Sequence, residues 1–185
     1  MSPEHERLFD EFVVARYAAL RRTGYLLCGD WHLAEDLVQT TLVKLYARWP
    51  RLRAQEAAYG YARTTLVRSY VDTRRRRGSY EVAAPDLTVL VEGGGRGGGR
   101  PADGWPSGDR DPADPDRRLD LLAALAQVSP GYRAVLVLRF WEDQSIESTA
   151  ATLRQTTGAV KSATNRGLAQ LRTILGDSLY EIASG

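Results

Sequence analysis

Residues 156–172 hold the side chains with the clearest capacity for chemistry. On a helical wheel, apolar and small residues of this segment gather on one side, and polar ones gather opposite. The polar side carries Lys161, Ser162, Asn165 and Arg166. These side-chain types hydrogen-bond base edges and phosphates in the major groove of DNA. An ordinary solvated face gives the same pattern, so the pattern favours DNA binding without establishing it.

A second set of cations lies along the helical pattern that ends at residue 77. Its members are Arg63, Arg68 and the run Arg74–Arg77. Cations at such a density bind a phosphate backbone, and interleaved aromatic residues can accept an unstacked base. The alternative is that the arginine run complements the dipole of a helix C-terminus. We interpret the arginine run as a nucleic-acid contact, and Tyr61 and Tyr70 as core residues.

Residue types that support catalysis or metal binding are scarce. The chain has one cysteine, Cys28, and two histidines, His5 and His32. A single cysteine forms no internal disulfide and no cysteine-based zinc cluster. The nucleophile–base pairs of hydrolases are nearly absent, and carboxylates such as Glu35 and Asp72 are scattered. The sequence therefore predicts a protein that is not an enzyme and that holds no metal or cofactor.

Membrane and export signals are not expected either. No apolar run approaches the ~18 residues that cross a bilayer. The N-terminal residues contain no apolar signal core. These patterns predict a cytoplasmic location and no membrane partner.

The composition changes sharply at residues 78–116. This segment holds 9 of the 17 glycines and 5 of the 8 prolines, and its net charge is −5. Such a sequence cannot bury enough apolar surface to offset its chain entropy, so it predicts a flexible linker. The flanking segments 1–77 and 117–185 carry net charges of +5 and +2. The chain is thus expected to be two mildly basic domains on an acidic tether.

Both flanking segments have helical periodicity. Three apolar stripes at spacings of three and four run through residues 1–77, and Pro50 ends the second. Residues 117–185 give four short helical segments, with Ser145 and Thr156 as N-caps of the last two. Their gap of about three residues indicates a helix-turn-helix. The predicted fold class is all-α, with two small helical domains joined by the Gly/Pro/Asp-rich linker.

Three strings carry a resemblance to a known family. HLAEDLVQTTLVKLYARW (32–49) and YARTTLVRSYVDTRRRR (61–77) resemble regions 2.1–2.2 and 2.3–2.4 of extracytoplasmic-function (group 4) RNA polymerase sigma factors, particularly the SigE-type group of actinobacteria. Residues 122–172 resemble region 4. The resemblance implies a region 2 domain at 1–77 for polymerase docking and for recognising and melting the −10 element. It implies a region 4 helix-turn-helix domain at 117–185 for the −35 element.

The resemblance also implies a role for each set of residues. In this family the second helix docks on the clamp helices of the polymerase β′ subunit. The matching positions are Asp36, Gln39, Thr40 and Val43. The following loop captures a base of the −10 element, and the third helix binds promoter DNA. The candidates there are Arg51, Arg53, Gln55, Arg63, Thr64, Arg68, Arg74 and Arg75. The candidates for reading the −35 element are Lys161, Ser162, Asn165 and Arg166.

The partners that the family implies are macromolecules. They are the polymerase core, through the β′ clamp helices and the β flap, and promoter DNA. An anti-sigma factor is a further expectation. Two alternatives stay open at this point. One is an autonomous helix-turn-helix regulator, which the basic first domain and the docking helix argue against; the other is an enzyme.

Three positions of the second domain depart from the family pattern. Ser148 replaces the glutamate that would complete a capping box with Ser145. Thr149 places a hydroxyl at an apolar core position. Arg154 stands where the family has its turn glycine, so the turn lacks an easy left-handed residue. We expect these departures to lower the stability of the domain by about 1–3 kcal/mol.

Overall fold

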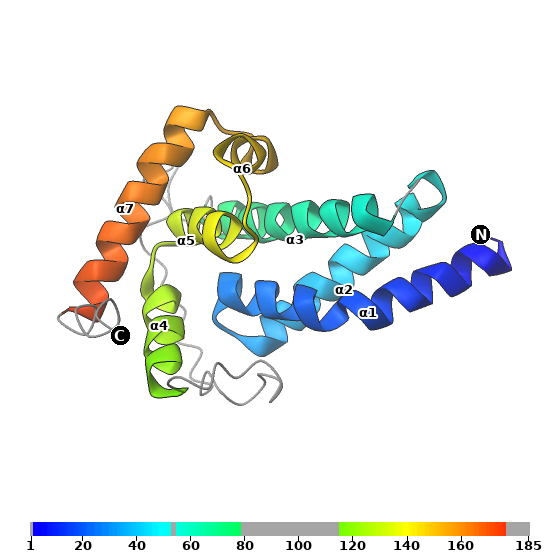
Figure 1. Cartoon of the computed structure of the whole chain (residues 1–185), viewed down its shortest axis with the longest axis horizontal. Coiled ribbons are helices and arrows are strands. Elements are labelled where there is room, and N and C mark those ends of the chain that lie inside the picture. The colour runs from blue at the N-terminus through cyan, green and yellow to red at the C-terminus, as the bar shows by residue number, and fades with distance from the viewer. Residues whose placement is uncertain (1, 53–54, 79–114, 177–185) are drawn as a thin grey trace.

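A computed structural model of the chain describes residues 2–52, 55–78 and 115–176. Every regular element in these ranges is a helix, which confirms the predicted all-α class (Figure 1). The elements are α1 (Pro3–Cys28), α2 (Trp31–Arg48), η1 (Trp49–Arg51), α3 (Gln55–Gly78), α4 (Pro115–Gln127), α5 (Pro130–Leu136), η4 (Val137–Trp141), α6 (Ile146–Leu153) and α7 (Thr157–Leu175). The predicted linker at 78–116 lies almost wholly outside the described residues.

The junction of α1 and α2 is set by local sequence. α1 ends at Gly29, whose φ of 71° suits a residue without a Cβ, and its N–H donates to the Tyr25 carbonyl. Asp30 follows directly and caps α2, where its carboxylate accepts a hydrogen bond from the Leu33 N–H at 2.9 Å. Since one helix ends where the next begins, α1 and α2 fold back on each other.

The helices α1, α2 and α3 form the first unit of the fold. Their apolar stripes meet in a cluster that includes Leu20, Val38, Leu45 and Leu66, all of them buried. Trp49 closes one end of this cluster, with its ring 5.2 Å from Phe9 and 5.3 Å from Phe12 between centroids. The apolar stripes predicted in residues 1–77 therefore pack together into one small core.

The helices α4 to α7 form the second unit, and α6 and α7 are its helix-turn-helix. Ser145 accepts a hydrogen bond from the Ser148 N–H at 3.0 Å, and Thr156 accepts one from the Ala159 N–H at 3.1 Å. Both predicted N-caps are confirmed. The turn between the helices contains Arg154, with φ 55° and ψ 47°. A non-glycine side chain in this left-handed conformation costs roughly 1–2 kcal/mol.

Thr149 is the clearest local defect in the second unit. It is fully buried in α6, and its hydroxyl has no hydrogen-bond partner. A buried hydroxyl left unpaired costs about 1–3 kcal/mol. The sequence predicted a hydroxyl at this core position, and the structure confirms it.

Replacing Thr149 with valine should therefore stabilise the protein. The side chains have nearly the same shape and similar helix propensities, so the expected gain is about 1–2 kcal/mol from removing the unpaired hydroxyl. Thermal and urea unfolding would measure it. The matched control is Thr173→Val on the exposed face of α7, where the hydroxyl bonds the Ala169 carbonyl. A Thr149→Val protein that is no more stable than the control would contradict the assignment.

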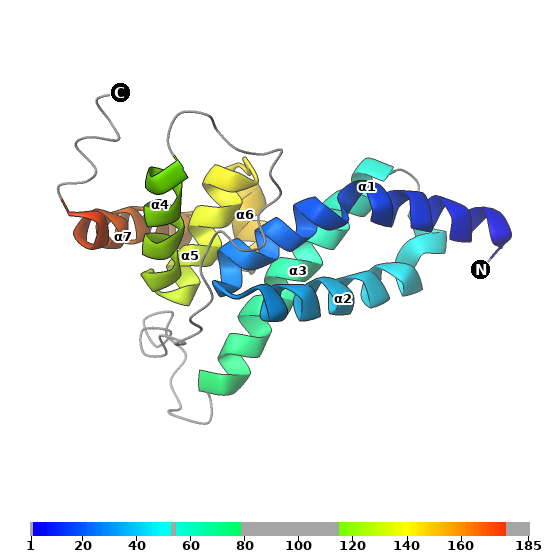
Figure 2. The ribbon, with the colours of Figure 1, turned by 90° about the horizontal axis from the view of Figure 1, so that it is seen from below.

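The two units pack against each other. Leu27 and Tyr70 of the first unit belong to the same buried cluster as Val135, Leu138 and Leu153 of the second. In Figures 1 and 2, α3 runs beside α5 and α6. The sequence predicted two domains on a tether, and the periodicity of each half gave no sign of this shared cluster.

Candidate nucleic-acid interface

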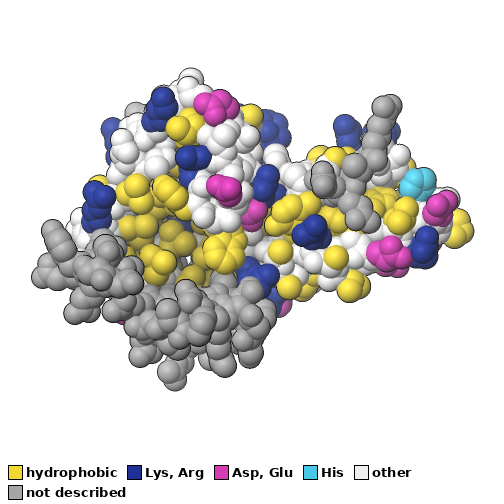
Figure 3. All heavy atoms as spheres, in the orientation of Figure 1, with side chains coloured by type: hydrophobic (Ala, Val, Ile, Leu, Met, Phe, Trp, Pro, Cys, Tyr) yellow, Lys and Arg dark blue, Asp and Glu magenta, His cyan; other side chains and the backbone are white. Residues whose placement is uncertain are grey.

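The helix α7 presents the polar face that the sequence predicted. Lys161, Ser162, Asn165 and Arg166 are all exposed. On the opposite side, Val160, Ala163 and Gly167 are buried. The face begins one turn after the Thr156 cap, at the end of the helix that enters the major groove in helix-turn-helix proteins. Figure 3 shows Lys and Arg side chains spread over the surface where α6 and α7 lie.

Gly167 explains how close α7 lies to its own domain. A Cβ at this position would lie 3.1 Å from two side-chain atoms of Leu136 in α5. The glycine therefore lets α7 approach α5 closely. That approach fixes which side of α7 faces out. Within the outer face, Arg166 also contacts its own domain, because its Nη1 donates a hydrogen bond to the Tyr132 hydroxyl at 3.3 Å.

The helix α2 presents the stripe predicted to dock on polymerase. Asp36, Gln39, Thr40 and Val43 are exposed, and their spacing places them on one face. Val43 is 71% exposed. Tyr46 extends the stripe by one turn and is 44% exposed; sequence reasoning missed it, although its spacing of three from Val43 marks the same face.

The loop between α2 and α3 is described in part. Arg51 ends η1 and is exposed. Trp49 is buried against the aromatic rings of α1 and anchors the start of the loop. Arg53 lies outside the described residues. Gln55 is the first residue of α3, and its side chain is not among those described.

The predicted DNA-binding residues of α3 have varied surroundings. Thr64 is half-buried. Arg63 and Arg68 do not point into solvent: Arg63 pairs with Glu142 (Nη1 to Oε2, 3.3 Å), and Arg68 donates from Nε to the Thr152 carbonyl at 2.9 Å. Both partners belong to the second unit. Promoter contact by these two arginines was expected from the sequence, and their engagement within the chain was not.

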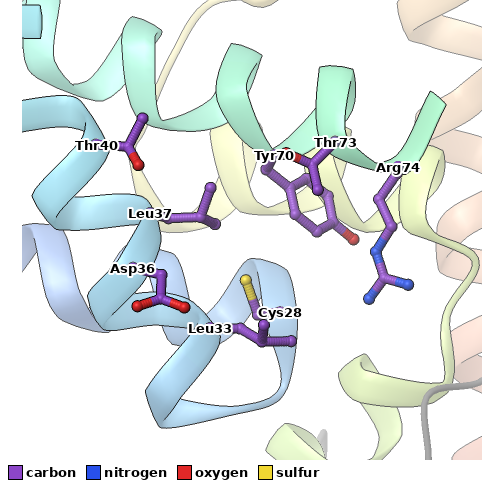
Figure 4. A pocket seen from close by; sticks show the side chains of 8 residues that line it. All are labelled: Cys28, Leu33, Asp36, Leu37, Thr40, Tyr70, Thr73 and Arg74. Carbon is purple, nitrogen blue, oxygen red and sulfur yellow. The ribbon is translucent and has the colours of Figure 1, made fainter. Parts of the chain in front are cut away.

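Arg74 lines one side of a small cavity. The side chain of its neighbour Arg75 is not among those that the structure describes. The cavity has a volume of about 190 Å³ (Figure 4). Its lining residues are Cys28, Leu33, Asp36, Leu37, Thr40, Tyr70, Thr73 and Arg74. Burial raises the pKa of the Tyr70 hydroxyl, and the nearby Arg133 and Arg74 oppose that shift. The Arg74 guanidinium lies 5.7 Å from the centre of the Tyr70 ring, a cation–π contact.

Two absences hold for residues 2–52, 55–78 and 115–176. No group of three or more His, Cys, Asp or Glu side chains is placed to hold a metal ion in these ranges. None of their helices is long and apolar enough to span a membrane.

Two residues that organise the structure escaped the sequence analysis. Arg133 is 5% exposed and donates to the carbonyls of Leu27 and Val128, at 3.0 and 2.8 Å, and also to that of Ala126. Glu142 holds Arg63. The signal for Arg133 was a lone cation inside the apolar run GYRAVLVL, because an arginine there must find polar partners.

A helical unit with a cation-rich third helix, followed by a helix-turn-helix with a polar recognition face, defines a class of two-part DNA-binding regulators. The comparisons with known proteins agree. The model of Sigma-70 region 2 matches residues 12–80, and that of Sigma-70 region 4 matches residues 118–171. The RNA polymerase sigma-E factor of Streptomyces coelicolor is 34% identical over 164 residues, which are 89% of this chain and 84% of that protein.

Two more relatives extend the comparison. The ECF RNA polymerase sigma factor SigE of Mycolicibacterium smegmatis is 32% identical over 179 residues, which cover 95% of this chain and 64% of that protein. Among solved structures, the sigma factor RpoE from Bartonella quintana, crystallised with the anti-sigma factor NepR, superposes with a TM-score of 0.59 at 23% identity. It covers 90% of this chain and 96% of that chain, and it shows the shared fold.

The chain belongs to the extracytoplasmic-function family of RNA polymerase sigma factors. The resemblance found in the sequence is confirmed. Sigma factors are regulatory DNA-binding proteins that bind core polymerase and direct it to promoters through the −10 and −35 elements. The alternative of an autonomous helix-turn-helix regulator is set aside, because the match includes region 2 as well as region 4.

Proposed function

We propose that this sigma factor divides its work between residues 1–77 and 117–185. The first domain docks on core polymerase through Asp36, Gln39, Thr40 and Val43. The second reads the −35 element through the outer face of α7. The observation that carries the proposal is the placement of that face: four polar side chains are exposed directly after a capped turn, with buried small and apolar residues behind them.

The −10 element falls to α3 and to the loop before it. Arg51 and Arg53 with Gln55 are the candidates in the loop. Along α3 the candidates are Arg63, Thr64, Arg68, Arg74 and Arg75. Guanidinium groups at this density supply phosphate contacts. The chain acts as a binding subunit in the cytoplasm, with no catalytic centre of its own.

The proposed partners are core polymerase, through its β′ clamp helices and β flap, and promoter DNA. An anti-sigma factor is proposed as a third partner. Its support is the fold shared with RpoE of Bartonella quintana, which was crystallised with such a factor.

Reconstituted transcription tests the function. Core polymerase supplemented with this chain should give discrete transcript 5′ ends on genomic templates. The sequences upstream of those ends should share two elements at a fixed spacing. Core polymerase alone should give none of these ends. Random start sites in the presence of the chain would contradict the proposal.

A matched pair of variants tests the docking stripe by its retention on core polymerase. Val43→Glu places a charge in the proposed contact. Val14→Glu makes the same change on α1, at an apolar side chain that is 84% exposed and outside the stripe. We expect Val43→Glu to weaken retention on core polymerase about tenfold or more, as for a charge placed in an interface core. Val14→Glu should bind like the wild type, and equal binding of the two variants would contradict the assignment.

A further inference from the structure

We propose that Cys28 is a thiol-modification site: a small disulfide that carries a carboxylate exchanges with its thiol, and the group transferred to Cys28 fills the cavity beside α2 and weakens docking on core polymerase. The effect on docking rests on the proposed role of Asp36 and Thr40. The reaction at Cys28 does not rest on that role, so the two can fail separately.

The cavity lies where α1, α2 and α3 meet. Cys28 is the last residue of α1, and its side chain lines the cavity with those of Leu33 and Leu37 of α2 and Tyr70 of α3. The volume of about 190 Å³ exceeds that of an engineered protein cavity of about 150 Å³ that binds benzene. Cys28 is half-buried and belongs to no disulfide. A small molecule can therefore reach its sulfur from the solvent.

One buried polar group points to a ligand in this cavity. Tyr70 is 3% exposed, and its hydroxyl has no hydrogen-bond partner. Figure 4 shows this hydroxyl pointing toward the space that Cys28 and Arg74 also face. Buried polar groups without a partner are rare in proteins. An acceptor atom on a molecule in the cavity would supply the missing hydrogen bond.

The charges around the cavity favour both a thiolate and an anionic ligand. The Arg74 guanidinium lines the cavity and lies 5.7 Å from the centre of the Tyr70 ring. Burial lowers the pKa of Arg133 and Cys28 opposes that shift, which places the thiol within electrostatic range of a second guanidinium. Nearby cations stabilise the thiolate, which is the form that reacts. Asp36 is the carboxylate among the lining residues, and because it is exposed, solvent screens its charge.

The expected reaction is thiol–disulfide exchange. The Cys28 thiolate attacks one sulfur of the small disulfide, an S–S bond forms to Cys28, the original S–S bond breaks, and the other half leaves as a thiolate. The leaving thiolate takes up the proton that the Cys28 thiol lost, and the disulfide itself is the oxidant. A carboxylate on the transferred group can accept a hydrogen bond from the Tyr70 hydroxyl and pair with Arg74. Because the chain has one cysteine, no second thiol of the same chain reverses the exchange.

The transferred group lies next to the docking stripe. Asp36 and Thr40 line the cavity, and both are exposed members of that stripe. Figure 4 shows the two side chains on α2, on the side of the cavity away from Arg74. A group attached to Cys28 therefore occupies space beside the surface that core polymerase is proposed to cover. Reduction of the mixed disulfide removes the group and should restore docking.

Two reagents of matched length and opposite charge test the site in the full-length protein. Dithiodipropionate carries a carboxylate on each half, and cystamine carries an ammonium. Mass spectrometry of the intact protein follows the adduct, and the protein unfolded in guanidinium chloride gives the intrinsic rate for each reagent. Relative to those rates, the folded protein should react about threefold faster with dithiodipropionate, as expected for one partly exposed charge pair. Tyr70→Phe, which keeps every charge, should reduce this preference. Equal relative rates for the two reagents would overturn the site.

Retention on core polymerase tests the consequence. The protein is treated with dithiodipropionate, freed of reagent and mixed with untreated core polymerase. The modified wild type should bind about tenfold more weakly than the untreated protein, and reduction before mixing should restore binding. Cys28→Ser, treated in the same way, is the matched control and should bind like the untreated wild type. Circular dichroism should show the same helix content with and without the adduct.

The possible results distinguish this inference from the proposed function. A folded adduct that binds core polymerase as well as the untreated protein would overturn the effect on docking. An adduct that has lost its helices would also overturn it, because the cavity would then not hold the transferred group. If the untreated wild type is not retained on core polymerase, the docking assignment fails, and the two reagents still decide whether Cys28 is a modification site.

Discussion

Replacing Arg133 with methionine is expected to lower the free energy of unfolding by about 3–5 kcal/mol. Arg133 is buried and donates to the carbonyls of Leu27, Ala126 and Val128. Methionine fills a similar volume and donates to none of them. A buried carbonyl that loses its partner costs about 1–3 kcal/mol, and three such losses, partly relieved by relaxation, give the stated range.

The position of Arg133 explains why one side chain contributes so much to the free energy of unfolding. Leu27 lies in the last turn of α1, and Ala126 lies in the last turn of α4. The guanidinium therefore caps two helices at once, one from each domain, and its charge is favourable at both C-terminal dipoles. Burial lowers the pKa of Arg133, and the carbonyls that surround it supply the hydrogen bonds that a buried cation needs.

Urea unfolding followed by far-ultraviolet circular dichroism would measure the loss. Arg7→Met is the matched control, because Arg7 forms only an exposed ion pair with Glu11 one helical turn away. Such a pair contributes about 0.3–0.5 kcal/mol. A loss below about 1 kcal/mol for Arg133→Met would mean that the carbonyls find other partners and that the double cap is not what holds the domains together.

The sequence predicted the structural features that depend on residues close together in the chain. Apolar spacing located the helices, and the hydroxyls of Ser145 and Thr156 marked where two of them begin. The exposed face of α7 followed from the same periodicity. These predictions succeed because a helix places residues three and four apart on one face. The spacing of the apolar residues therefore shows directly which face of the helix is buried.

The contact between the domains was beyond such reasoning. Arg63 and Glu142 are 79 residues apart in the chain, and Arg133 and Leu27 are 106 apart. Periodicity within a segment shows which side of a helix is apolar, but it does not show which distant segment covers it. The predicted role of Arg63 and Arg68 in DNA binding rested on their charge and on the resemblance of residues 61–77 to a family region, and neither shows whether a carboxylate or a helix end elsewhere in the chain binds the same charge.

The end of α5 shows a second limit of prediction from sequence periodicity. The periodicity of residues 117–185 predicted regular helical segments, whereas the second of them is α-helix only to Leu136 and continues as a π-helical turn to Trp141. The Glu142 N–H donates to the Val137 carbonyl at 3.0 Å, five residues back. This wider turn shifts the register, and the residue that follows it is the glutamate that reaches α3. Spacings of three and four cannot reveal a turn with a different period.

Substituting Lys161 and Asn165 together with alanine is expected to reduce transcription from promoters that depend on the −35 element by about 30-fold or more. Both side chains are exposed within the first three turns of α7, where a recognition helix meets base edges. A lost base contact costs about 1–3 kcal/mol, so two losses give roughly 2–6 kcal/mol, and each 1.4 kcal/mol is a factor of ten. Arg166 is left intact because it also donates to Tyr132.

The control and the promoter together decide what the loss means. Arg172→Ala removes an exposed cation from the far end of the same helix, and it should reduce transcription less than about threefold if base contact, rather than the net charge of α7, is what counts. On a template whose −35 element is scrambled, the double variant and the wild type should become equally weak, because the contacts being removed no longer exist. Retention on core polymerase should be unchanged throughout. A double variant that loses core binding, or that stays weaker than the wild type on the scrambled template, would show that α7 acts through the polymerase or through the fold of its domain and not through the −35 sequence.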